Sequence, residues 1–203
     1  ARVQFPVDWN SVLACMDACY RTHGEIWVMV VPKRPVPDAL DEAQSRQLAA
    51  RGALRLVGTG APEEKLVLVA IGSYQLVEVL RASERLGQHA VAHAVVVVVE
   101  PGRLKSPHDS AQAQATWTDD DLAEIFPEHS DVRIVVSHTR PEPITGVLRR
   151  IDTGPRRTSY LGFINRGGTL DTFGMLFANR CTWAHVLSRA AQTMGLASQS
   201  WLT

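Results

Sequence analysis

From Lys65 onward, short continuous apolar runs alternate with longer segments whose apolar residues lie three to four positions apart. Continuous runs are typical of strands buried on both faces, and the wider spacing is typical of amphipathic helices. The predicted strands are residues 65–71, 94–99, 132–136 and 159–164, the predicted helices are 74–86, 119–126, 143–150 and 182–194, and the polar residues 103–116 are predicted to form a loop. The alternation predicts an α/β fold in which a mostly parallel sheet lies between two helical layers, a three-layer α/β/α arrangement.

A helix and a strand are predicted before this alternating region, at residues 8–21 and 26–31. Three prolines within residues 32–37 then interrupt regular structure and suggest a domain boundary. The predicted divisions are residues 1–33, a linker at 34–64 that holds a short helix at 41–51 and a brief strand at 53–57, and a domain at 65–203. Alone, the first helix and strand would leave apolar faces and backbone groups without partners. They therefore need a further domain, another chain or a rearranged packing.

Charge and composition exclude several classes of partner. The 21 basic residues balance the 21 acidic ones, so the chain has no long-range attraction to nucleic acid or to an anionic membrane. The longest apolar run, residues 94–99, is far shorter than the roughly 20 residues that span a bilayer. Residues 1–6 lack both a signal-peptide layout and an initiator Met, which suggests a processed chain or part of a longer one. Three cysteines without a CxxC pair predict free thiols and a cytoplasmic location.

Candidate chemistry follows the strands, because ligands of open parallel sheets bind beyond the strands' carboxyl ends. Glu100 is at such a position, and so are Gly72 and Ser73. Gly72 and Ser73 open a helix whose backbone N–H groups could hold an anion, although a plain strand-to-helix turn explains them equally. His138 follows another strand, either as a ligand, acid or base, or as a hydrogen-bonded structural residue. A loop rich in glycine and arginine could grip a phosphate or carboxylate, or be a surface turn. Its residues are Asn165, Arg166, Gly167, Gly168 and Thr169.

Common catalytic and metal-binding motifs are lacking from the sequence. His89 and His93 are four positions apart but have no obvious third ligand, so no metal site is expected. Neither a Gly-x-Ser-x-Gly elbow nor an HExxH motif occurs. From the residues alone, the chain is an α/β domain without an assigned function.

The first forty residues, however, resemble the phosphoketolase family. The resemblance rests on Asp8-Trp9-Asn10-Ser11-Val12-Leu13, on Cys19-Tyr20-Arg21, and on Ile26-Trp27-Val28-Met29-Val30-Val31-Pro32-Lys33-Arg34-Pro35. Later segments are similar in the same order, including Gly168-Thr169-Leu170-Asp171-Thr172-Phe173-Gly174-Met175 and Asn179. The family pattern implies that residues 1–33 end a pyrimidine-binding domain and that residues 65–203 fold like a transketolase C-terminal domain.

The resemblance implies a function that depends on thiamine diphosphate and Mg, both held by residues outside this chain. No Gly-Asp-Gly with a downstream Asn, the metal-diphosphate pattern of thiamine enzymes, occurs in the sequence. We therefore expect no catalytic residue and no bound cofactor in this chain alone. Lys33 matches the family's lysine that contacts the substrate phosphate, and Arg34 could assist it. The implied partners are the missing N-terminal and pyrimidine-binding domains or a partner subunit, in a homodimer that takes a sugar phosphate.

Departures from the family pattern keep further interpretations open. Pro32 replaces a glycine, Arg166-Gly167 replaces two glutamates, and Thr139-Arg140 replaces Gly-Tyr. These changes in charge and size allow the chemistry of a ketose-phosphate epimerase of the same superfamily in place of phosphoketolase or transketolase chemistry. A stand-alone anion-binding or interaction module without catalysis is a second interpretation, and a generic nucleotide-binding α/β protein is a third.

Overall fold

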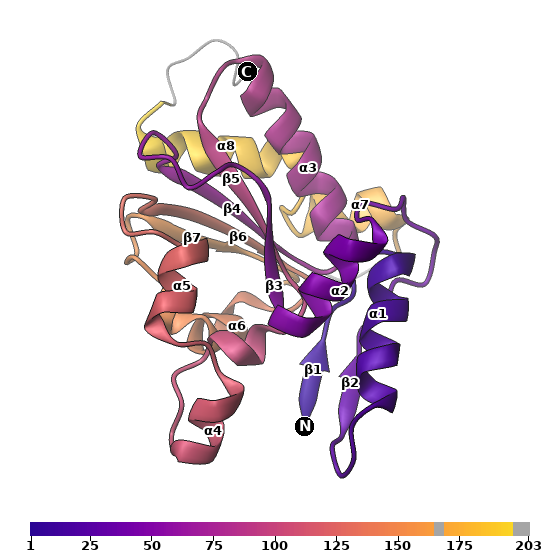
Figure 1. The fold of residues 1–203 in the computed structure, drawn as a ribbon. Helices are drawn as coiled ribbons and strands as arrows, with labels where there is room; N and C mark the ends of the chain where they lie inside the picture. The colour runs from indigo at the N-terminus through magenta and orange to yellow at the C-terminus, as the bar shows by residue number, and fades with distance from the viewer. Residues whose placement is uncertain (165–168, 197–203) are drawn as a thin grey trace.

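A computed structural model describes residues 1–164 and 169–196, and a five-stranded sheet forms its centre (Figure 1). The strands lie in the order β3-β5-β4-β6-β7. Their bounds are β3 (Ala53–Val57), β4 (Leu66–Ile71), β5 (His93–Val98), β6 (Val132–Ser137) and β7 (Thr158–Leu161). β3 runs antiparallel to β5, and the other neighbours are parallel. The predicted mostly parallel sheet is confirmed.

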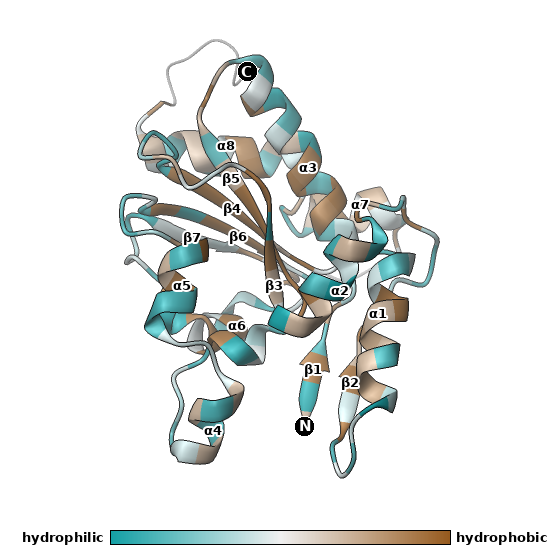
Figure 2. Cartoon of the chain, in the orientation of Figure 1, coloured by the Kyte–Doolittle hydropathy of each residue, from teal (hydrophilic) through white to brown (hydrophobic). Residues whose placement is uncertain are grey.

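Helices cover both faces of this sheet. α2 (Glu42–Arg51), α3 (Ser73–Gln88) and α8 (Trp183–Met194) share one apolar core with it. α5 (Asp119–Ile125) and α6 (Pro141–Val147) contribute to a second core on the other face. In Figure 2 the central strands are brown along most of their length, as expected for strands buried on both sides. The three-layer α/β/α prediction is therefore confirmed.

The N-terminal segment forms a small sheet of its own beside the larger one. β1 (Arg2–Gln4) pairs in parallel with β2 (Trp27–Met29), and α1 (Trp9–Tyr20) connects them, since parallel strands need a crossover. The Asp8 carboxylate caps α1 by accepting from Ser11 N at 2.8 Å, and its second oxygen accepts from Leu40 N at 2.8 Å. This contact ties the start of α1 to the linker. The division at residues 33 and 34 stays a prediction.

Several short elements differ from the sequence prediction. The predicted strands at 26–31 and 159–164 are shorter, and β1 and α7 (Thr172–Ala178) were not predicted. Residues 103–116 are not a plain loop, because a 3-10 turn, η1 (Pro101–Leu104), and a short helix, α4 (Ser110–Ala115), occur there. Residues 143–150 are divided between α6 and a second turn, η2 (Arg149–Ile151). Side-chain caps explain both extra helices: Asp109 accepts from Gln112 N, and Asp171 accepts from Gly174 N.

Within the described ranges, no helix is both long enough and apolar enough to cross a membrane.

Candidate functional site

Two of the predicted sites meet at the carboxyl edge of the sheet. Gly72, at the start of α3, has φ +110°, and a Cβ placed on it would lie 2.9 Å from the Cβ of His138. The ring of Phe5 is 6.5 Å from that of His138, measured between centroids. The Ser73 hydroxyl donates to the Pro6 carbonyl at 2.9 Å. The structure therefore brings Gly72, Ser73 and His138 together beneath the segment that follows β1.

That segment covers part of the carboxyl edge. Phe5 N donates to the Val99 carbonyl, just after β5, at 2.7 Å. The Ser73 hydroxyl is used for a contact within the fold, which favours the turn interpretation for this side chain. No side chain caps the first turn of α3 within the described chain, so anion binding by its backbone stays a prediction.

His138 is exposed, although one side of its ring faces Phe5. Partial burial of the imidazole lowers the pKa of His138 below its usual value, so the ring is neutral at pH 7. A neutral imidazole can accept or donate one hydrogen bond but adds no positive charge to the edge. Its role as a ligand, acid or base stays a prediction.

Lys33 and Arg34 lie exposed on the linker after β2. Arg34 N donates to the Tyr74 hydroxyl at 3.2 Å, which holds the linker beside the first turn of α3. Arg34, Pro35 and Phe173 line a small cavity of about 260 Å³ there. Within the described chain, Lys33 has no ion-pair partner, so its ammonium is open to a ligand or to another polypeptide.

The loop of Asn165, Arg166, Gly167 and Gly168 lies outside the described residues. Thr169, which follows it, is exposed. Just before the loop, Ile164 N donates to the Asn179 side-chain carbonyl at 2.6 Å and fixes the end of the β7 connection. The predicted phosphate grip in this loop remains a prediction.

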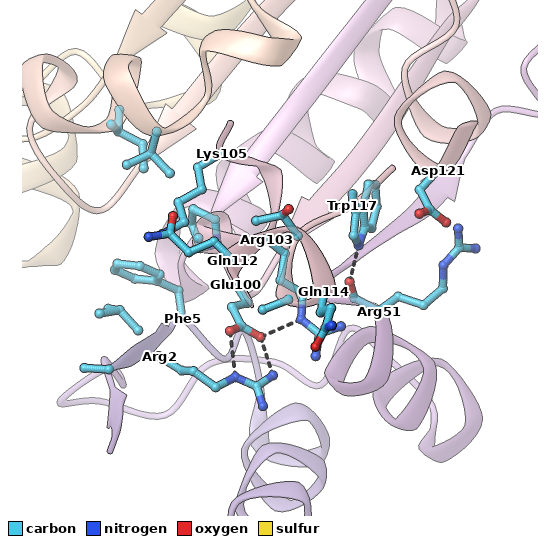
Figure 3. Close-up of a pocket in the computed structure, with 18 of the residues that line it drawn as sticks. Arg2, Phe5, Arg51, Glu100, Arg103, Lys105, Gln112, Gln114, Trp117 and Asp121 are labelled. Carbon is cyan, nitrogen blue, oxygen red and sulfur yellow. Dashed lines mark hydrogen bonds and ion pairs between the residues drawn. The ribbon is translucent and has the colours of Figure 1, made fainter. Parts of the chain in front are cut away.

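A larger cavity lies elsewhere on the carboxyl side, and the sequence analysis missed it (Figure 3). It has a volume of about 810 Å³ and lies between β1, α6 and the segment from η1 to α4. At its base, the carboxylate of Glu100 accepts from Arg2 Nε at 2.8 Å, Arg2 Nη2 at 2.7 Å and Arg103 Nε at 2.9 Å. Glu100 comes soon after β5, so the sequence places it at a strand end. Its partner Arg2 is 98 positions away, which no local pattern reveals.

Metal and nucleophile chemistry find little support in the described side chains. No group of three His, Cys, Asp or Glu residues there could hold a metal ion. His93 is engaged on both ring nitrogens, with Ser83 Oγ at 2.7 Å and the Val91 carbonyl at 2.8 Å. Burial raises the pKa of Cys15 and of Cys181 to about 12, so neither is a thiolate at pH 7.

Comparison with known proteins places this arrangement in a family. The model of the XFP C-terminal domain matches residues 33–201. This chain belongs to that family. A probable phosphoketolase from Brucella abortus is 29% identical to this XFP domain chain over 202 residues, which are 97% of the chain and 25% of the relative. A probable phosphoketolase from Streptomyces avermitilis is 38% identical over 110 residues, 51% of the chain and 14% of the relative.

Solved structures support the same fold. A transketolase from Pichia stipitis has a TM-score of 0.70 with 16% identity, and covers 96% of this chain and 25% of its own. A chain titled as a split gene transketolase, inactive beta4 tetramer, has a TM-score of 0.61 with 14% identity, and the match covers 97% of this chain and 58% of that one. The XFP domain chain thus spans about a quarter of the Brucella abortus phosphoketolase and of the Pichia stipitis transketolase.

Proposed function

We propose that this chain is the C-terminal part of a thiamine-diphosphate-dependent enzyme of ketose phosphates, with phosphoketolase as the favoured reaction. The observation that carries the proposal is the match of the XFP C-terminal domain to residues 33–201, in a chain a quarter as long as its phosphoketolase relatives. In this role, the chain supplies packing surface to the rest of the enzyme and one contact to the substrate phosphate. We assign it to the cytoplasm, in agreement with its three free cysteines.

An exposed apolar face on the N-terminal unit supports the packing role. Trp9, Leu13 and Tyr20 of α1 are 64, 48 and 80% exposed, and their spacing puts them toward one side of the helix. Ile26 and Val28, on the neighbouring strand segment, are 70 and 45% exposed. Figure 2 shows apolar segments on α1, β1 and β2 together. Exposed apolar side chains at this density are typical of a surface that packs against another polypeptide segment.

The two-stranded sheet supports the same role. Two parallel strands are too few for independent stability in water, and no further strand pairs with their outer edges within residues 1–164 and 169–196. We propose that the rest of a pyrimidine-binding domain supplies those strands, from the same polypeptide or from a partner subunit. The split gene transketolase among the similar structures is a precedent for the second arrangement. A homodimer of the complete enzyme is part of the proposal.

Lys33 is the proposed contact to the substrate phosphate, with Arg34 as a possible helper in the same loop. The lysine is exposed and lies between Pro32 and Pro35, which restrict the backbone on both sides. The hydrogen bond from Arg34 N to the Tyr74 hydroxyl holds this loop beside the first turn of α3. A restricted loop limits the entropy that is lost when the ammonium binds a phosphate dianion.

The residues of this chain do not fit the cofactor itself. The metal-diphosphate motif is missing from the sequence, and the described acidic side chains form no metal-binding group. When bound in the complete enzyme, thiamine diphosphate with Mg supplies the electron sink for cleavage of the ketose phosphate. Within this proposal, the chain's own residues bind and position, and carry no chemical step.

The test is a kinetic comparison in the enzyme produced from the complete gene, with its partner subunit if there is one. Loss of a charge-assisted hydrogen bond from Lys33→Ala should raise KM for the ketose phosphate about tenfold or more and change kcat little. Lys65→Ala is the matched control, because it removes the same charge beside the amino end of β4 and should leave KM unchanged. Equal KM values for the two variants would remove the phosphate contact from the proposal.

Product analysis in the same assay separates the possible reactions. Phosphoketolase chemistry gives acetyl phosphate from the ketose phosphate and inorganic phosphate. An epimerised ketose phosphate would identify the epimerase reaction of the superfamily. A complete gene product that binds no thiamine diphosphate and acts on no ketose phosphate would favour the stand-alone binding module.

A further inference from the structure

The cavity of about 810 Å³ contains a cluster of cations around one carboxylate. Glu100 is 4% exposed and holds the guanidinium groups of both Arg2 and Arg103. Two cations thus share one buried anion. Glu25 contacts Arg2 at 3.4 Å, but its side chain is 44% exposed and screened by water.

Lys105 adds a third cation to the same wall of the cavity. In the described part of the chain, no carboxylate lies within ion-pair distance of Lys105. Arg103 gives its Nε to Glu100 and its Nη1 to the Ala50 carbonyl at 2.7 Å. Its Nη2 makes no bond to another described residue, so the wall keeps unused donors from two cationic side chains.

The segment that carries these cations is closed by its own hydrogen bonds. Trp117 N donates to the Arg103 carbonyl at 2.8 Å, and the Trp117 indole donates to the Arg51 carbonyl at 2.6 Å. Residues 104–116 therefore form a compact loop with fixed ends, an arrangement that is frequent in binding sites. The α4 helix inside this loop has no buried residue, so the core does not explain it. Instead, its Gln112 and Gln114 line the cavity.

Part of the remaining lining is apolar and aromatic, and Glu25, Arg51, Thr116 and Thr139 are among its polar residues. Phe5, Ile144 and Val147 form part of the wall, together with the indole of Trp117, which is 7% exposed. Asp121 also lines the cavity, but its carboxylate accepts from Thr118 N at 2.9 Å. Figure 3 shows Asp121 on the side of Trp117 away from Lys105. The cavity therefore combines cationic groups with apolar and aromatic side chains, and its volume is within the size range of small-molecule sites.

We propose that this cavity binds a small organic phosphate monoester, with its phosphate on Lys105 and Arg103 and its organic part against Trp117 and Phe5. A phosphate has three terminal oxygens, enough for the two cations and for an amide of the α4 glutamines. A carboxylate carries a single negative charge, whereas a phosphate monoester carries up to two, so a carboxylate would be attracted less strongly to the two cations. Lys33 and Arg34 do not line this cavity, so the site goes beyond the phosphate contact proposed above.

The test is calorimetric titration of the full 203-residue chain with phenyl phosphate, inorganic phosphate and benzoate. We expect one saturable site for phenyl phosphate, with weaker binding of inorganic phosphate and of benzoate. Lys105→Ala should weaken phenyl phosphate about tenfold, and Lys105→Arg should largely restore it, because the arginine keeps the charge and the donors. Lys65→Ala removes an equal charge elsewhere on the chain and should leave the affinity unchanged.

Three results would overturn the proposal. Binding that is absent up to about 10 mM would leave the cavity without this ligand class. If Lys105→Ala and Lys65→Ala weaken phenyl phosphate binding equally, the effect comes from the net charge of the chain and not from a contact in the cavity. Benzoate that binds as tightly as phenyl phosphate would replace the phosphate assignment with a carboxylate site. None of these results depends on Lys33, so the function proposed above for the chain is tested independently of this cavity.

Discussion

Glu100→Gln is the substitution that tests the link between the N-terminal sheet and the main domain. Its carboxylate joins Arg2 of β1 to Arg103 of η1 and also accepts from Gln4 Nε2 at 3.4 Å. The glutamine keeps the shape of the side chain but removes the charge, so the two guanidinium groups lose the buried anion that they share. Since the side chain of Glu100 is only 6% exposed, water replaces little of the loss.

The expected loss of stability in Glu100→Gln depends on how exposed Arg2 and Arg103, the partners of Glu100, are. Breaking a fully buried pair costs about 3–5 kcal/mol, but the side chains of Arg2 and Arg103 are 24 and 25% exposed and regain some hydration. We therefore expect a loss of about 2–3 kcal/mol in the free energy of unfolding. Glu124→Gln is the matched control, because its ion pair with Arg51 is at the surface, with Glu124 59% exposed, and should cost less than about 1 kcal/mol.

Urea unfolding at pH 7 measures both variants, and native-state hydrogen exchange locates the effect. Because Arg2 belongs to β1, protection of the Val30 amide, which donates to the Gln4 carbonyl at 2.8 Å, should fall before that of the central strands. If Glu100→Gln unfolds at the same urea concentration as Glu124→Gln, with Val30 still protected, the ion cluster does not hold the N-terminal sheet in place.

Three further predictions address single sites. Gly72→Ala should lower the free energy of unfolding, measured in urea, by about 2 kcal/mol or more. The φ of +110° is unfavourable for alanine, and the new Cβ would lie 2.6 Å from Gln75 Oε1. An unchanged stability would contradict this close approach between Gly72 and α3. Cys15 and Cys181 should resist a thiol reagent in the native protein at pH 8, because both are buried and have a pKa of about 12. The same reagent should label all three cysteines after denaturation. Rapid labelling of all three in the native state would contradict their burial. Burial alone would raise the pKa of Glu64, but hydrogen bonds from the amides of Thr59 and Gly60 and the charge of Arg55 lower it below the usual 4.5. Above pH 4.5, Glu64→Gln should therefore lower the free energy of unfolding by about 1–2 kcal/mol. The stability difference between the two proteins should vanish as the pH falls through the lowered pKa of Glu64. A difference that does not vary with pH would show that the charge of Glu64 is not what stabilises this loop.

Most of the main sheet was predictable because its central strands, β4, β5 and β6, consist largely of apolar residues. Residues 66–71 and 132–137 are buried along their whole length, so both faces select the same kind of side chain. β1 gave no such signal, because it is three residues long and contains Arg2 and Gln4. Gln4 is fully buried by contacts that reach Glu100, far along the chain, and a local pattern does not contain that information.

The candidate sites also differ in how far they could be predicted from the sequence. The meeting of Gly72 with His138 follows from topology, since β4 and β6 are parallel neighbours whose carboxyl ends share one edge. The large cavity does not follow from it, because its wall depends on a loop that the polar residues 103–116 left without a predicted shape. The Asp109 cap and the bond from Trp117 N to the Arg103 carbonyl give that loop its form.

The central claim is that this chain completes a thiamine-diphosphate enzyme without holding the cofactor. Calorimetric titration of thiamine diphosphate with Mg tests it most directly, with the 203-residue chain in one cell and the protein from the complete gene, with any partner subunit, in the other. The account predicts no binding to the chain alone and micromolar binding to the complete protein. Micromolar binding to the chain alone, or none to the complete protein, would contradict it.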